Sequence, residues 1–195
     1  EFTNGDGGLH YLNLLNTPFM ISYTANELYG IGCGLVAVFI VDVIGTASPV
    51  TVTRKECKSS CENIKEGLCS GGGCCQTAIP TRLESFGVAL LETATESTND
   101  FSSFAVLAEI GKYTFESVDL TLDAKQISKK YDEKVIPVVL DWSIGYMACG
   151  DAKANSTTYV CHDNSDCTDD IKNGGHRCTC HGGYEGNPYL SPGCK

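Results

Sequence analysis

The sequence has few methionines, few basic residues and no long apolar run. Only 2 of its 195 residues are Met, and 14 Lys or Arg oppose 24 Asp or Glu, for a net charge of −10. This charge argues against nucleic acid and anionic membrane surfaces as partners. The longest apolar run, Ile31 to Ile44, is interrupted by Asp42. A membrane-spanning helix needs about 20 apolar residues, so we expect this run to be a buried strand pair or core segment.

The sequence also lacks a recognisable catalytic pattern. Its four histidines (His10, His162, His176 and His181) are scattered, and no serine or cysteine nucleophile pairs with them. A carbohydrate hydrolase would need two carboxylates roughly 5 to 10 Å apart, and no pattern among the acidic residues nominates a pair. We therefore expect a binding protein and not an enzyme.

Cysteine, in contrast, is abundant. Twelve cysteines, an even number, would be a liability in a reducing cytosol but form a disulfide framework in an oxidising compartment. We therefore predict an extracellular protein. The chain does not begin with Met, which indicates a mature or trimmed piece of a longer protein. The cysteines fall into two groups of six: Cys33, Cys57, Cys61, Cys69, Cys74 and Cys75, then Cys149, Cys161, Cys167, Cys178, Cys180 and Cys194.

The spacing of the two groups predicts two modules, 1–148 and 149–195, with a boundary near Gly145 to Cys149. We expect a mostly β, disulfide-rich fold, because short apolar and alternating runs dominate the first module. Strands are predicted at Val50–Thr53, Phe86–Leu91, Phe104–Ala108 and Ile136–Trp142. The polar stretch 93–100 is predicted to be a loop.

Two further segments of the first module carry a local pattern. Tyr113 and Phe115 share one face, and Val118, Leu120 and Leu122 continue in a shifted register. This pattern predicts strands interrupted by a bulge or turn at Glu116-Ser117. Asp123 is a suitable N-cap for a short helix that places Ala124, Ile127 and Tyr131 on one side. The run Lys125, Lys129, Lys130 and Lys134 then predicts an exposed helix face.

The second cysteine group has a distinctive spacing. Cys178-Thr179-Cys180, followed by Gly182-Gly183-Tyr184 and Gly186 before Cys194, resembles an EGF-like domain. The resemblance implies the pairs Cys149–Cys167, Cys161–Cys178 and Cys180–Cys194. Such a module serves either as a rigid spacer or as a ligand-binding site. Some EGF-like modules bind calcium through carboxylates just before their first cysteine, but residues 144–148 offer none. If the thiols were not in disulfides, a zinc site could be built from Cys178, Cys180, His181 and His162.

The first cysteine group is more diagnostic. It contains the string Cys69-Ser-Gly-Gly-Gly-Cys74-Cys75, in which the adjacent cysteines must reach different partners and pin two layers together. With Val139-Leu140-Asp141-Trp142 and the segment 183–190, this string resembles the extracellular region of plant wall-associated receptor-like kinases. The pairing of these six cysteines stays open, since six cysteines allow 15 connectivities.

The resemblance implies a function. The family has an N-terminal galacturonan-binding module, of which this chain would lack the opening half, and a cytoplasmic Ser/Thr kinase that has no counterpart here. The implied partners are cell-wall pectin or oligogalacturonides, and the alternative is a pathogen protein or partner receptor. A free secreted inhibitor or structural wall protein is a third possibility. No cofactor or metal is expected, except calcium as a bridge to pectin, and any membrane contact would require a helix outside this chain.

A polyanion such as pectin needs local positive charge on this acidic protein. The most basic stretch provides five candidate ligand-binding residues: Arg54, Lys55, Lys58, Lys65 and Arg82. Arginine can grip a carboxylate with two hydrogen bonds and lysine offers a point charge, although a solvated face would have the same composition. Trp142 could stack on a sugar ring but is expected in the core. Asn155-Ser156-Thr157 is an acceptor sequence for N-glycosylation.

Overall fold

The computed structural model describes residues 2–3, 10–41, 55–92, 101–154, 157 and 159–195. The chain forms two compact units, which we call the N-terminal unit (Glu1–Leu15 and Met20–Leu140) and the C-terminal unit (Asn16–Phe19 and Asp141–Lys195). The division therefore passes through β3 (Phe19–Ile21) and β10 (Leu140–Trp142). The predicted boundary, near Gly145 to Cys149, lies a few residues further along the chain than the division between Leu140 and Asp141.

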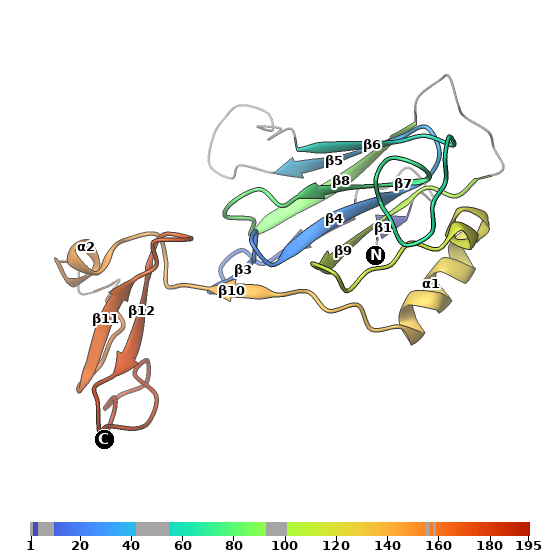
Figure 1. The fold of residues 1–195 in the computed structure, drawn as a ribbon. Coiled ribbons are helices and arrows are strands. Elements are labelled where there is room, and N and C mark those ends of the chain that lie inside the picture. Colours follow the sequence, from blue (N-terminus) through green and yellow to red (C-terminus); the bar gives the residue numbers. More distant parts are fainter. Residues whose placement is uncertain (1, 4–9, 42–54, 93–100, 155–156, 158) are drawn as a thin grey trace. The chain divides into compact units, whose positions relative to one another are not determined.

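The N-terminal unit contains two four-stranded antiparallel sheets (Figure 1). The first sheet has the order β1-β9-β4-β7, and the second has the order β2-β8-β5-β6. The strands of the first are β1 (Phe2–Thr3), β9 (Phe104–Glu109), β4 (Asn26–Ile31) and β7 (Cys74–Ala78). Those of the second are β2 (His10–Asn13), β8 (Ser85–Glu92), β5 (Leu35–Val41) and β6 (Glu56–Ser59). The predicted mostly β, disulfide-rich fold is confirmed.

The main core lies between the two sheets. Ala37 and Phe39, two residues apart on β5, point inward and are fully buried, as the alternation of side chains along a strand requires. Phe39 packs against Phe86 of β8 with their ring centroids 5.6 Å apart. Leu28 of β4 and Ala105 of β9 reach this core from the first sheet. The two sheets therefore form a sandwich.

The first sheet is buried on its outer face as well. Tyr29 and Ile31 of β4 alternate with Leu28 and join a second cluster of buried side chains on the opposite face. The cover comes from the 3-10 helix η1 (Ser117–Thr121) and the α-helix α1 (Ala124–Glu133), whose Leu120 and Ile127 are buried in this cluster. Because both faces are covered, β4 reads as a nearly continuous buried strand.

A buried ion pair joins α1 to η1. The Asp119 side chain is completely buried, and Lys130 Nζ lies 2.5 Å from Asp119 Oδ1 and 2.8 Å from Glu116 Oε2. Burial alone would lower the pKa of Lys130, but its hydrogen bonds to Asp119 and Glu116 outweigh burial and raise that pKa to about 12. Since the folded pKa is above the ordinary value of about 10.4, Lys130 stabilises the fold below that pH. The contribution is lost as the pH rises through about 12.

Several local predictions are confirmed and others are wrong. Strands β8 and β9 and the Asp123-capped helix α1 lie where the pattern placed them. Residues 113–122 are not strands, because Tyr113, Phe115 and Leu120 enter the outer cluster from an irregular segment and η1. Only the last three residues of the predicted strand Ile136–Trp142 form a strand. Lys125, Lys129 and Lys134 are exposed as predicted, whereas Lys130 is half-buried and ion-paired. The predictions for Val50–Thr53 and 93–100 lie outside the described residues.

The C-terminal unit is small and cross-linked. It contains α2 (Cys149–Ala154) and a hairpin of β11 (Ser165–Asp169) and β12 (His176–Cys180). Its disulfides are Cys149–Cys167, Cys161–Cys178 and Cys180–Cys194, the pairing that the EGF-like resemblance implies. Few large side chains are buried among the described residues of this unit, so three bridges at about 2–5 kcal/mol each would supply much of the stability.

Within the described part of the chain, none of the helices is long and apolar enough to cross a membrane.

The ion pair at α1 makes a stability prediction. Lys130→Met leaves the buried Asp119 carboxylate without its cation, which we expect to lower the free energy of unfolding by about 3 kcal/mol. Lys129→Met, on the exposed face of the same helix, should change it by less than about 0.5 kcal/mol. Urea unfolding followed by circular dichroism measures the free energy of unfolding of both variants. Equal effects would contradict a stabilising ion pair between Lys130 and Asp119.

Candidate functional site

The six cysteines of the first group form three bridges around one end of the sandwich. Cys57 of β6 is bonded to Cys75 of β7, so this bridge links the second sheet to the first. Cys33, after β4, is bonded to Cys61, and Cys69 is bonded to Cys74. Adjacent Cys74 and Cys75 therefore reach different partners, as the sequence required. We call the segment 60–73, which these bridges enclose, the stapled loop.

Two glycines allow the stapled loop to pack tightly. A Cβ atom at Gly72 would lie 2.8 Å from the carbonyl oxygen of Glu62 and closer still to that of Asn63. Gly73 has a φ of +75°, and a Cβ there would press on Phe115 and Leu120 of the outer cluster. Only glycine fits both positions without moving the backbone, which explains part of the Gly71-Gly72-Gly73 run.

The stapled loop is also anchored to the segment that covers the first sheet. The backbone N–H of Ser117 donates to both carboxylate oxygens of Glu66 at 3.0 and 3.1 Å, and the Ser117 hydroxyl donates to Glu66 as well. The N–H of Gly67 donates to the carbonyl oxygen of Phe115 at 2.8 Å. Three bridges and these hydrogen bonds hold the loop in one conformation, so its exposed side chains are presented from a rigid support.

The structure separates the predicted basic residues. Lys58 on β6 and Lys65 in the stapled loop both lie toward the end where β4 turns into β5, because Ser59 pairs with Leu35 and Cys61 is bonded to Cys33. Lys55 is exposed just before β6. Arg82 lies beyond the opposite end of β7, where Ala78 pairs with Glu27, so it belongs to another surface. Arg54 lies outside the described residues.

Lys58 is available to a ligand. Its ammonium lies 3.5 Å from Glu56 Oε1, and its side chain is 69% exposed. An exposed pair of this kind contributes about 0–1 kcal/mol, which a carboxylate ligand can readily replace. Beside Lys65 in the stapled loop, Ile64 and Leu68 are exposed, Leu68 by 60%. The surface around the stapled loop thus combines ammonium groups with apolar side chains. The binding roles of Lys55, Lys58, Lys65 and Arg82 stay predictions.

Other predicted site residues have different positions. Trp142 is half-buried and packs edge-on against Tyr189 with ring centroids 5.1 Å apart. Cys178 and Cys180 are disulfide-bonded and offer no thiolate for zinc. Among the described residues, Cys161, Cys167 and His176 have potential metal-ligand atoms close together, but both cysteines are also in disulfides. Asn155 lies outside the described residues.

Comparison with curated proteins of similar sequence identifies the family to which this chain is related. The chain is 33% identical over 178 residues to wall-associated receptor kinase 1 of Arabidopsis thaliana, a match that covers 87% of this chain. It is 30% identical over 196 residues, 93% of this chain, to wall-associated receptor kinase 3 of the same plant. The chain is homologous to the wall-associated receptor kinases. The resemblance inferred from the cysteine strings is therefore confirmed.

The match is to part of each relative. The chain spans 22% of the length of wall-associated receptor kinase 1 and 25% of that of wall-associated receptor kinase 3. No family model and no solved structure matches the chain.

The sequence could not have shown the anchors of the stapled loop. Glu66 and Ser117 are 51 residues apart, and neither belongs to a recognisable motif. The triple-glycine run was visible, but its role depends on the position of Glu62, Asn63 and Phe115 in the fold.

Gly72→Ala tests the packing of the stapled loop. The added methyl group meets two backbone carbonyl oxygens, so we expect a loss of about 1–3 kcal/mol in unfolding free energy and faster tryptic cleavage at Lys65. Gly111→Ala is the control, because Gly111 has a φ of +77° but open space around it. Its substitution carries only the conformational cost, about 1 kcal/mol, and should leave cleavage at Lys65 unchanged.

Proposed function

We propose that this chain is an extracellular ligand-recognition region of a plant cell-surface receptor kinase, and that it binds cell-wall pectin or oligogalacturonides. Homology to wall-associated receptor kinases supports a receptor-kinase ectodomain, and six disulfides fit an extracellular location. The chain matches about a fifth to a quarter of those relatives. In this proposal the chain itself catalyses no reaction, and signalling is carried out by a Ser/Thr kinase elsewhere in a longer protein.

The stapled loop is the observation that carries the proposal. Galacturonate carboxylates repeat along the pectin chain, so their binding requires cations held in a fixed arrangement. Lys65 in the stapled loop and Lys58 beside it lie at the same end of the sandwich, and three bridges restrain this loop. Because the whole protein carries −10, such binding must be local, and it should weaken with added salt. Calcium would act only as a bridge between acidic groups of protein and ligand.

Oligogalacturonide binding to the stapled loop has a direct test. The triple variant Lys55→Glu, Lys58→Glu and Lys65→Glu should lower the affinity at least tenfold, since each exposed ion pair contributes about 0.2–1 kcal/mol and each reversal adds repulsion. The control triple, Lys112→Glu, Lys125→Glu and Lys129→Glu, changes net charge equally from exposed positions elsewhere. Arg82→Glu alone should change affinity by less than about twofold. Isothermal titration calorimetry with and without calcium measures all of these affinities.

Equal losses in the two triple variants would show that only net charge matters, and the stapled loop would lose its role. If binding requires calcium, the metal acts as a bridge between acidic groups of the protein and of the ligand.

The second candidate function is recognition of a pathogen protein or a partner receptor. It is favoured by the exposed Ile64 and Leu68 beside Lys65, because protein interfaces combine apolar contact with a polar rim. Absence of oligogalacturonide binding in both calcium conditions would leave this candidate as the better one.

A further inference from the structure

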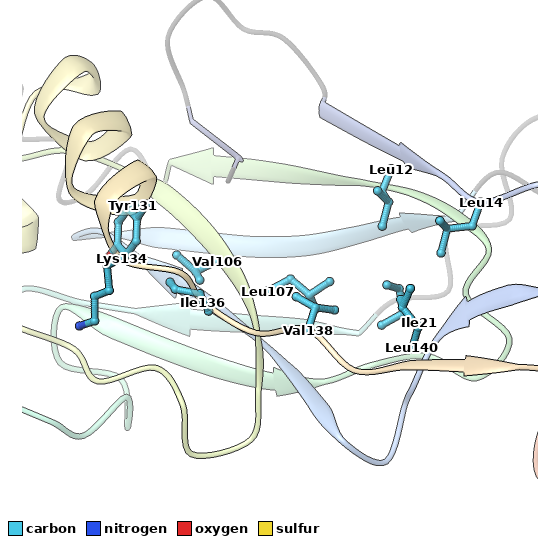
Figure 2. A pocket seen from close by; sticks show the side chains of 10 residues that line it. All are labelled: Leu12, Leu14, Ile21, Val106, Leu107, Tyr131, Lys134, Ile136, Val138 and Leu140. Carbon is cyan, nitrogen blue, oxygen red and sulfur yellow. The ribbon is translucent and has the colours of Figure 1, made fainter.

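A second candidate binding site lies at the edge of the first sheet, apart from the stapled loop. It is an elongated groove of about 510 Å³ in the N-terminal unit. Figure 2 shows its lining side chains spread in a row from Lys134 to Leu14. The lining residues are Leu12, Leu14, Ile21, Val106, Leu107, Tyr131, Lys134, Ile136, Val138 and Leu140.

The walls of this groove are two extended segments with matching patterns. Leu12 and Leu14 lie two residues apart on one wall, and Ile136, Val138 and Leu140 alternate along the other. Residues two apart on an extended chain point to the same side. Both walls therefore present apolar side chains to the same space.

A buried asparagine fixes the second wall. The Asn26 side chain accepts a hydrogen bond from the N–H of Val139 and donates one to the Val139 carbonyl oxygen, each at 2.8 Å. The N–H of Glu109 donates to the Pro137 carbonyl oxygen at 2.8 Å. These bonds hold the segment extended although residues 136–139 pair with no strand that the structure describes. Val138 and Leu140 are thereby turned to the groove while remaining partly exposed.

The floor follows the edge of β9. Val106 and Leu107 are consecutive, so their side chains leave the strand on opposite faces. Val106 belongs to the outer cluster and Leu107 packs against the core between the sheets. The groove therefore wraps around the sheet edge and is continuous with apolar side chains on both sides.

One lining residue is charged. Lys134 follows α1. Its ammonium forms no salt bridge with any described residue and acts on the Glu116 carboxylate through its charge alone, whereas Lys130 one turn earlier is held by Asp119 and Glu116. In Figure 2 Lys134 lies next to Tyr131 at one end of the row, and its nitrogen points outward from that end. The groove thus offers an apolar channel with a single cation at its end.

We propose that this groove binds a small amphiphile with a long apolar body and one terminal carboxylate. Its volume lies within the roughly 300–1,000 Å³ of small-molecule sites, which are mostly apolar with a few polar groups that orient the ligand. An oligogalacturonide would not fit this lining, because its hydroxyl groups would lose water without gaining hydrogen-bond partners. The site is therefore distinct in chemistry from the one proposed at the stapled loop.

Dodecanoate is the probe, titrated below its micelle concentration and followed by calorimetry, with dodecyltrimethylammonium as the same tail carrying the opposite charge. We expect dodecanoate to bind more tightly than the cation. Lys134→Glu should weaken dodecanoate binding roughly three- to fivefold, as loss of one exposed ion pair does. Lys129→Glu, an exposed lysine of α1 outside the groove, should leave it unchanged.

The apolar wall has its own matched pair of variants. Val138→Asp places a carboxylate in the groove and should weaken dodecanoate binding at least tenfold. Val135→Asp adds the same charge three residues earlier, where the side chain is 87% exposed and does not line the groove. Equal thermal unfolding of the two variants confirms that both are folded.

Three results with this chain would overturn the proposal. They are no dodecanoate binding at millimolar concentration, equal effects of Val135→Asp and Val138→Asp, and equal affinity for the cationic amphiphile. Binding to this chain that is lost in a longer native protein would also overturn it, since the groove would then be filled by the protein's own residues.

Discussion

The bridge between Cys57 and Cys75 is the constraint on which the N-terminal unit depends. It joins β6 of one sheet to β7 of the other from within the core. Because Cys75 is used there, Cys74 bonds to Cys69 and closes the stapled loop beside it. The same pair of adjacent cysteines thus holds the sandwich together and shapes the surface proposed to bind ligand. A covalent link of this kind acts mainly by restricting the unfolded chain.

Burial of the first sheet on both faces explains the rest of the architecture. One face meets the second sheet, and the other is covered by η1 and α1 through the buried pair of Asp119 and Lys130. The cover of the first sheet ends in an irregular segment at 135–139. Among the described residues the edge of β9 is therefore incompletely closed, and the apolar groove lies there. The stapled loop and the groove are consequently products of the same packing, with opposite chemical character.

Local patterns in the sequence predicted the elements that depend on local physics. The apolar runs of β8 and β9 and the capping Asp123 are visible without knowledge of the fold. The strand predicted around Tyr113 and Phe115 was wrong, because an irregular segment that covers a sheet can bury alternating apolar residues as well as a strand can. The partners that decide this, Asp119 with Lys130 and Glu66 with Ser117, are brought together only by tertiary structure. The separation of Arg82 from Lys58 has the same origin, because register across sheets is not readable from spacing.

The sandwich and the stapled loop both require one particular pairing of the first six cysteines, although six cysteines allow fifteen arrangements. Peptide mass spectrometry of the non-reduced protein, purified from an oxidising expression compartment, measures this pairing directly. We expect the pairs Cys57–Cys75, Cys69–Cys74 and Cys33–Cys61. A peptide that joins Cys57 to Cys74, or free thiols among the six, would contradict the sandwich and the stapled loop together.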